Sequence, residues 1–589
     1  MTKKRPSRTL TIALMLTILL LGGMTAWAAW IANHYKNLIR DKLPGWIADA
    51  TDSVYHVSLK DISINIITRR VTLSGIRLWP DTARVNELKA LRQKPSITTV
   101  EFEVPKAEIK GVNWGNIITK NEVDCKQVVL WQANGTITHI PVLADSVARN
   151  QVDSPKQTKR KTGVIKQFSV GEIDLMQSNI KFRSRGKDDD SSLWEMNNCN
   201  VTLNDWLIKA NQNNDTSRFL FAKKGRVQMD SLVYKTSGTI YNISTSDIDF
   251  KTESHRLEIK NFAITSSVTE HEFYKIYRYQ KEIYRVRFPS VIFEELNWTK
   301  WINDHQLIAE RMLLKRPSML IFLSRIPEQS GLNRAGKFPH QLLHKMSLKV
   351  AINQIKISDG EVKYAEVSNV TKKEGDVNYD AINGTIYNVT NIDSLVEKHK
   401  ICTVALAGKL YKNSDIRATF KLSLPDTNGY FTMDGTLKSL DAAQINNAAE
   451  ALAVVKIKSF HVSNMKMHVE GNQYKSTGQF TIPYSDFKLE LQAAKKTGDT
   501  PRIKDKHVTS FLANNFVFYS DNPMPGEHLR SASASVKRDP YKSFFGLIWK
   551  NIYSGLEQTV VKSKTLENVA KKHGKKEGIF QRLFGKKNK

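Results

Sequence analysis

Cysteine is scarce in this chain of 589 residues, which contains only Cys125, Cys199 and Cys402. Three cysteines, odd in number and widely spaced, exclude a disulfide framework, and the lack of any C-x-x-C pair excludes a cysteine-based zinc site. We interpret the three side chains as small buried apolar residues. Their number and spacing leave the redox compartment of the protein undecided.

Acidic residues are also few relative to basic ones. The chain has 88 Lys and Arg against 58 Asp and Glu, which gives a formal net charge of +30. Such a balance favours partners that carry phosphate groups, namely nucleic acids or anionic lipid headgroups. Hydrophobic residues make up 41% of the chain, which excludes wholesale disorder, and the length suits several domains or one extended repetitive domain.

Recognisable catalytic motifs are missing too, since the sequence has no G-x-S-x-G, no G-x-G-x-x-G and no papain-type cysteine context. The segment "GLNRAGKF", residues 331–338, has the glycines and lysine of a phosphate-binding loop, but Phe338 stands where a hydroxyl must hold magnesium. His340 and His344 are spaced like zinc ligands on a helix, but no Glu lies between them and no third ligand is evident. We therefore predict no enzyme activity, no metal and no cofactor.

The longest apolar run, residues 9–33, carries no charge and follows a cluster of basic residues. It is long enough to cross a hydrocarbon core of about 30 Å at about 1.5 Å per helical residue. A removable signal peptide is the alternative, because Ala26-Trp27-Ala28 fits a cleavage site. The run continues beyond that site, however, and its tryptophans suit a membrane interface. We predict a retained transmembrane anchor in residues 1–33, with a cytoplasmic N-terminus and the remainder exported.

Most of the remaining chain alternates apolar and polar residues at period two, which is typical of strands with one apolar face. In "SLKDISINIITRRVTLSGIRLW", residues 58–79, the phase slips by one residue at Ser74-Gly75, which suggests a bulge. With Φ for an apolar residue, the phrase Φ-x-Φ-x-x-Φ-x-Φ begins at Val71, Phe168, Val227, Leu257, Val350 and Val455. Three copies carry a second Φ-x-Φ that starts twelve positions after the first residue. The uneven spacing excludes a propeller, and we predict a strand–bulge–strand–turn–strand module reused along a long antiparallel meander.

Helical patterns are few. Short helices are predicted at residues 34–50, 269–288 and 441–452, and a further helix within 296–317 leads back into a strand. Residues 146–163 and 184–192 are polar and are predicted to be loops. The sequence thus predicts a mostly β fold, with strands from about residue 55 to 535.

The C-terminal region, residues 541–589, has a different character. One helical face of residues 543–562 carries Phe545, Ile548, Trp549, Ile552, Leu556 and Val560. This helix either caps the end of the sheet or lies in a membrane interface, since both roles need the same face. The basic tail 571–589, with Phe580 and Phe584 set among cations such as Lys575 and Lys576, favours a phosphate-rich surface over a disordered tail.

An anchor, a short helix and then "YHVSLKDISINIITRRVTLSGIRLWPD" resemble the start of AsmA-like proteins, a family that is similar to the chorein-type bridge-like lipid transfer proteins. The stretch "LKVAINQIKISDGEVKYAEV…NYDAINGTIYNVTN", residues 348–391, resembles the repeated element of that family, in which strands are separated by D-G and N-G turns. The resemblance implies a long curved antiparallel sheet over residues 34–540, open along one side. It implies a Gram-negative envelope and an apolar concave face that shelters acyl chains, and it brings no catalytic residues.

The function expected from this resemblance is transport of phospholipids or other acyl-bearing lipids between the envelope membranes, in support of outer-membrane homeostasis. The protein would be a single-pass inner-membrane protein with its bulk in the periplasm. Its C-terminus would meet the outer membrane or an envelope partner, and nucleic acid is not expected. The candidate groove residues are Ile64, Val71, Leu73, Phe168, Val170, Ile352 and Ile357. The candidate membrane-contacting residues are Phe545, Trp549, Phe580, Phe584, Lys575 and Lys576.

A β-rich envelope scaffold or outer-membrane assembly factor that binds proteins is the alternative. Its apolar faces would close into sandwiches, in which both layers supply apolar residues and the core is dry. In an open groove the ligand supplies the missing layer, and each sheltered methylene is worth about 0.8 kcal/mol. Both arrangements have the same period-two pattern.

Overall fold

The computed structural model describes most of the chain from residue 45 to residue 562. The described residues are 45, 48, 51, 53–65, 68–90, 96–120, 122–141, 167–185, 191–209, 215, 217–236, 239–453, 455–497, 500–505 and 518–562. The predicted anchor (9–33), the predicted loop 146–163 and the basic tail (571–589) lie outside them. Within this described part, no helix combines the length and the apolar character needed to span a bilayer.

The chain divides into two compact units, and both are built mainly of strands. Unit 1 comprises residues 1–263 and 294–305, and unit 2 comprises residues 264–293 and 306–589. The mostly β fold predicted from the alternating pattern is therefore confirmed. Alternation is clearest in β24 (Ser531–Lys537), where exposed and buried side chains alternate at every residue.

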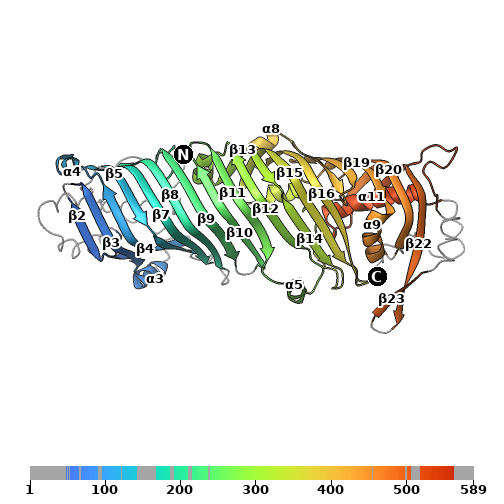
Figure 1. Cartoon of the computed structure of the whole chain (residues 1–589), viewed down its shortest axis with the longest axis horizontal. Coiled ribbons are helices and arrows are strands. Elements are labelled where there is room, and N and C mark those ends of the chain that lie inside the picture. The colour runs from blue at the N-terminus through green and yellow to red at the C-terminus, as the bar shows by residue number, and fades with distance from the viewer. Residues whose placement is uncertain are drawn as a thin grey trace, which may run out of the picture. The chain divides into compact units, whose positions relative to one another are not determined.

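Unit 1 is a mixed sheet with short helices (Figure 1). Its strands are β1 (Tyr55–Ser58), β2 (Asp61–Asn65), β3 (Arg70–Pro80), β4 (Ser96–Lys110), β5 (Glu122–Trp131), β6 (Asn134–Pro141), β7 (Gln167–Arg185), β8 (Ser191–Lys209), β9 (Lys224–Thr236), β10 (Tyr241–Lys251) and most of β11 (Arg256–Ser266). Its helices are α3 (Thr82–Ala90), α4 (Trp114–Lys120) and α6 (Trp298–Asp304). Strands β5 and β6 both pair parallel to β7, one along each half of it. They act as one long strand interrupted at Gln132, whose φ is 53°.

Unit 2 repeats this arrangement at its start. Its strands are β12 (Ile283–Glu294, whose last residue belongs to unit 1), β13 (Gln306–Lys315), β14 (Ser318–Ser324), β15 (Lys349–Val367), β16 (Glu374–Thr390), β17 (Ile401–Leu410), β18 (Ser414–Ser423), β19 (Phe431–Asp441), β20 (Val455–Gly471), β21 (Lys475–Thr481), β22 (Tyr484–Thr497), β23 (Thr500–Asp505) and β24. Strands β13 and β14 run parallel to the two halves of β15, and β15 to β20 then pair antiparallel. The sheets are thus mixed, and the prediction of a purely antiparallel meander is wrong.

The turn predicted inside the repeated module is also wrong, because each of the three longer copies lies on one continuous strand (β7, β15 and β20), with a bulge at the predicted turn in β7 and β15. The copy that begins at Val350 lies on one continuous strand, β15, with register shifts on both sides of Gly360. Asp359 takes up the extra residue with φ 55°, and its backbone N–H donates to Asn383 Oδ1 at 3.1 Å. A D-G pair suits a turn and a bulge equally, since Asp and Gly both tolerate left-handed backbone.

The helices predicted within strand-rich regions are present but short. Helices of unit 2 are α5 (Glu270–Tyr277), α7 (Pro339–Lys345), α8 (Asp393–Lys398), α9 (Ala442–Ala448, continued by a π turn at Ala449–Ala453) and α11 (Phe544–Val560). The prediction at 441–452 is confirmed, and so is the helix within 296–317 that leads back into a strand. The helix predicted at 269–288 ends at Tyr277, because Arg278 adopts a left-handed conformation with φ 57°.

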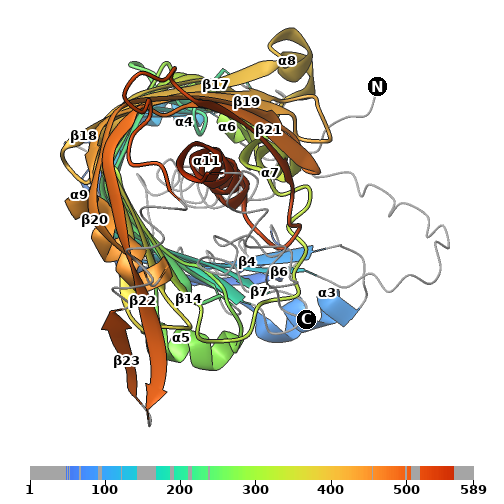
Figure 2. The same ribbon diagram turned by 90° about the vertical axis from the view of Figure 1, so that its right-hand side faces the viewer.

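Helix α11 lies on the inner side of the curved C-terminal strands of unit 2 (Figure 2). Three phenylalanines join it to the sheet and to the segment before α7. The ring centroids of Phe338 and Phe544 are 4.9 Å apart, and those of Phe431 and Phe544 are 4.8 Å apart. The predicted C-terminal helix is confirmed. Of the two roles considered for it, a cap on the sheet or a helix in a membrane interface, the structure shows the cap.

Candidate ligand-binding surfaces

One face of strands β7 to β10 in unit 1 carries a row of large apolar side chains. Strand register aligns Phe182 with Trp194, Trp194 with Tyr234, and Tyr234 with Ile243. The ring centroids of Trp194 and Tyr234 are 4.3 Å apart. All four side chains are half-buried, although paired strands flank both Trp194 and Tyr234.

A second row lies beside the first on the same face. Register aligns Ile180 with Met196 and Met196 with Leu232, and all three are half-buried. We call the two rows together the β7–β10 apolar face, formed by Ile180, Phe182, Trp194, Met196, Leu232, Tyr234 and Ile243. A residue inside a sheet is fully buried when a second layer packs on it. Within the described residues, no element packs on this face, and its side chains stay half-buried.

The opposite face of the same strands is polar. Glu195 lies between two lysines of neighbouring strands, and its carboxylate is 3.3 Å from Lys181 Nζ and 3.1 Å from Lys235 Nζ. Hydrogen bonds from Lys235 and Lys181 hold the pKa of Glu195 below its usual value. The strands are therefore amphipathic, and an apolar ligand is directed to one side.

A line of polar side chains crosses β6 to β9 beside the register shift between β7 and β8. Asn179 Nδ2 donates to Asn134 Oδ1 at 3.1 Å, and the Asn198 backbone N–H donates to Asn179 Oδ1 at 3.1 Å. Asn198 Nδ2 in turn donates to Asp230 Oδ2 at 2.7 Å. The register shift at Ser178 resets the alternation in β7, so apolar residues on both sides of it point to one face. It lies beyond the slip of the repeated phrase at Gly171-Glu172, at the position where a turn is predicted.

Most of the predicted groove residues lie in packed protein. Val71, Leu73, Phe168 and Val170 are buried in one hydrophobic cluster of unit 1, together with residues such as Trp206, Phe219 and Trp298, and Ile64 packs against it. In unit 2, Ile352 is buried and Ile357 is half-buried. These side chains are on the predicted apolar face of their strands, but protein atoms already cover most of them. Lipid contact at these positions stays a prediction.

The three cysteines and the pair His340 and His344 all lie within the described residues. All three cysteines are buried and free, as predicted, and burial raises the pKa of Cys125 to about 12 and those of Cys199 and Cys402 to about 11. His340 is buried whereas His344 is exposed, so the two do not face a common ligand. Across the residues that the structure describes, no group of three or more His, Cys, Asp or Glu side chains could hold a metal ion.

The face of helix α11 that packs on the core overlaps the predicted face in part, since Ile552 and Leu556 of the predicted face are partly buried against the core. The residues turned to the sheet include Phe544, Leu547, Ile548, Asn551, Gly555, Thr559 and Val560. Of the predicted face, Ile548 and Val560 are among them, whereas Phe545 and Trp549 are 62% and 61% exposed. The side of the helix that contains Gly555 packs on the sheet. Contact is close there, because a Cβ at position 555 would lie 2.5 Å from the Phe480 ring. The other membrane-contacting candidates, Lys575, Lys576, Phe580 and Phe584, lie outside the described residues.

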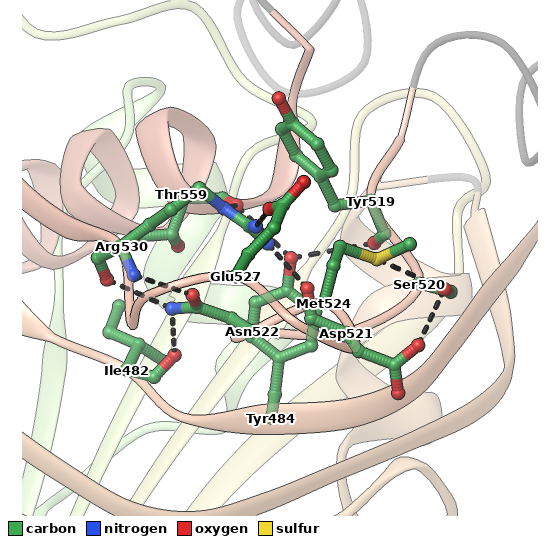
Figure 3. Close-up of polar contacts among 10 residues, drawn as sticks. All are labelled: Ile482, Tyr484, Tyr519, Ser520, Asp521, Asn522, Met524, Glu527, Arg530 and Thr559. Atoms are coloured by element: carbon green, nitrogen blue, oxygen red, sulfur yellow. Dashed lines mark hydrogen bonds and ion pairs between the residues drawn. The ribbon is translucent and has the colours of Figure 1, made fainter.

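A polar network fixes the C-terminal end of α11 (Figure 3). The Thr559 carbonyl accepts from Tyr484 Oη at 3.1 Å and from Arg530 Nε at 3.4 Å. Asn522 Nδ2 donates to the Ile482 carbonyl at 2.7 Å and to that of Arg530 at 2.9 Å. The last carbonyls of a helix need such partners. The network is therefore a structural clamp that holds α11 against the sheet.

Sequence reasoning did not single out Trp194, Met196 or Phe338. Tyr234 belongs to the copy that begins at Val227, so the pattern placed it on an apolar face, but its neighbours depend on register, which alternation alone does not give. In the sequence, Phe338 is considered only because it replaces the hydroxyl residue of a phosphate-binding loop. In the structure it is fully buried in the core of unit 2.

Comparison with known proteins gives no relative: no family model matches the chain, and no curated protein is detectably similar to it.

Proposed function

We propose that the protein is a non-enzymatic lipid carrier of the bacterial envelope, which shelters phospholipids or other acyl-bearing lipids on the apolar face of its sheet. It is held in the inner membrane by residues 1–33, with its bulk in the periplasm, and it moves lipid between the envelope membranes. The observation that carries this proposal is the β7–β10 apolar face. Seven large apolar side chains lie on one side of paired strands and stay half-buried.

An acyl chain is the ligand that suits this surface best. The face has no charged member, and its Trp194–Tyr234 pair offers a flat, broad contact. About ten sheltered methylenes would contribute about 8 kcal/mol before the loss of chain freedom. The lysines of the opposite face and the net charge of +30 also favour surroundings rich in phosphate groups.

Site-specific photocrosslinking tests the proposal. A photoreactive amino acid replaces Met196 in the full chain, and Leu193 is the matched control, because it is an apolar residue of the same strand on the opposite face. We expect a lipid adduct in the mass spectrum of the protein crosslinked at position 196 and none at position 193. Equal labelling at both positions would count against a one-sided lipid surface.

The scaffold alternative draws on a specific observation, which is the closed core of unit 2. There α11 covers β20, β21 and β24, and Phe338, Phe431 and Phe544 fill the space between helix and sheet. Extraction of the purified full chain with organic solvent, followed by mass spectrometry, separates the two functions. Stoichiometric lipid supports the carrier, whereas a lipid-free protein that retains its fold supports the scaffold.

A further inference from the structure

Three segments of unit 2 converge at the N-terminal end of α11. The Arg334 backbone N–H donates to the Pro540 carbonyl at 2.7 Å, which joins the segment before α7 to the segment after β24. Arg538 Nη2 donates to the Arg334 carbonyl at 2.9 Å and to the Lys542 carbonyl at 3.2 Å. Ser543 caps the helix by accepting from the Gly546 backbone N–H at 3.2 Å. Two basic side chains thus lie at the positive end of a helix.

The cations here exceed the anions. Arg334 forms a two-pronged pair with Glu282 at 2.6 and 2.7 Å, and Arg325 is 2.8 Å from Glu366. Among the described residues, neither Arg538 nor Lys542 forms an ion pair. Asp539 is close enough to act on both electrostatically, but it does not pair with either. Four cations therefore face three carboxylates.

Arg538 is unusual because it is buried although some of its hydrogen-bond donors have no acceptor. Its side chain is 6% exposed, and its Nε and Nη1 atoms have no hydrogen-bond partner. The guanidinium lies over the Phe338 ring, 4.3 Å from its centroid. Burial lowers the pKa of Arg538 and that of Lys542, and neighbouring arginines lower both further. A buried cation with unused donors is costly unless an anion meets it.

An aromatic stripe adjoins these cations. Tyr541, Phe545 and Trp549 follow one another at intervals of four residues and are 45%, 62% and 61% exposed. Phe545 contacts Phe544 with ring centroids 5.3 Å apart, and Phe544 contacts Phe338, over which Arg538 lies. Exposed aromatic residues beside unpaired cations match a molecule with an anionic end and an apolar body.

We propose that the N-terminal end of α11 binds the phosphate-bearing end of a lipid, with Lys542 and Arg538 at the phosphate and Phe545 and Trp549 along the acyl chains. The inference rests on the proposed lipid carriage and adds to it a headgroup class and a position for the headgroup. Free phosphate shares the anionic chemistry but lacks the apolar part, so the test must separate the two sources.

The experiment places a photoreactive benzoylphenylalanine at position 549 in the full chain, in cells grown on radiolabelled phosphate. After irradiation and denaturing purification, we expect covalent radiolabel on the protein, because the crosslink forms to an acyl chain that carries its phosphate. Lys542→Gln in this background should lower lipid affinity about tenfold, the loss expected for one charge-assisted contact, and the label with it. Lys550→Gln removes an exposed lysine of the same helix and should leave the label unchanged.

Each outcome decides the proposal. Absence of phosphate label at position 549, or full label in the Lys542→Gln variant, overturns it. If position 549 gives no label but the full chain binds inorganic phosphate and the Lys542→Gln variant does not, the site belongs to free phosphate and the lipid assignment is overturned. If position 196 is crosslinked to lipid and position 549 is not, the headgroup site at α11 is refuted, whereas lipid binding on the β7–β10 apolar face is supported. If neither captures lipid, both fall.

Discussion

At Gly555 a missing side chain determines how α11 sits on its sheet. A Cβ there would lie 2.5 Å from two atoms of the Phe480 ring, and that ring is almost fully buried. Gly555→Ala should therefore destabilise unit 2 by about 2 kcal/mol through overpacking. Thermal unfolding of the full chain, followed by circular dichroism, measures the shift.

Gly546→Ala is the matched control on the same helix. The nearest atoms to its added Cβ would be 3.4 and 3.5 Å away, which is ordinary contact. Alanine is the better helix former by about 1 kcal/mol, so this variant should be slightly stabilised. Equal destabilisation by both substitutions would contradict the close packing of Gly555 on Phe480.

Glu282 predicts a pH dependence of stability. Burial alone would raise the pKa of this carboxyl, but the hydrogen bonds and charge of Arg334 outweigh burial and lower the pKa. A carboxyl whose pKa is lowered by folding stabilises the fold above its unfolded value of about 4.3, and the contribution is lost as pH falls through the folded value. Wild type should lose stability more steeply than Glu282→Gln as pH falls below about 4. Parallel curves from denaturant unfolding at a series of pH values would refute this role.

At the scale of the element, the repeated phrase predicted strands correctly, but the bulge predicted at its slip occurs in only some copies: β20 shifts register at Ser459, whereas β7 and β15 keep their register at the slip. In two other copies the slip coincides with left-handed backbone, at Gly75 and Asn261. The phrase failed at Asp359-Gly360, because turn and bulge need the same residue types, and it carried no information on the parallel pairing of β14 with β15. Direction and register depend on contacts far apart in sequence, so Trp194 and Tyr234 could be assigned to faces but not to each other.

The bulge itself can be tested at Asp359, whose φ is 55°. Asp359→Gly should be neutral or stabilising, since glycine adopts this conformation without steric cost. Asp359→Val should destabilise by about 1–2 kcal/mol, since a β-branched residue is strained there. Both variants keep the backbone N–H that donates to Asn383. Urea unfolding of the two variants measures the difference. Equal stability would contradict a left-handed backbone at position 359.

At the scale of the whole molecule, charge is the property that the sequence shows most directly. The tail 571–589 has eight lysines and arginines against Glu577, and each contributes about 1 kcal/mol near an anionic leaflet at modest salt. Deletion of 571–589 should leave the unfolding transition of the β region unchanged and weaken binding to anionic vesicles. Vesicle cosedimentation over a salt series checks this, and undiminished binding with the same salt dependence would place the relevant charge elsewhere.

The position of α11 at the end of the described chain has a consequence for biogenesis. The strands that it covers, β20, β21 and β24, are all synthesised before it, and so is Phe338. Until residues 544–560 emerge, Phe431 and Phe480 have no helix over them, and the nascent unit presents an apolar surface to any chaperone nearby. A ribosome stalled before residue 543 should therefore hold a chaperone-bound, protease-sensitive chain. One stalled after residue 562, with enough linker to clear the exit tunnel, should release the chaperone.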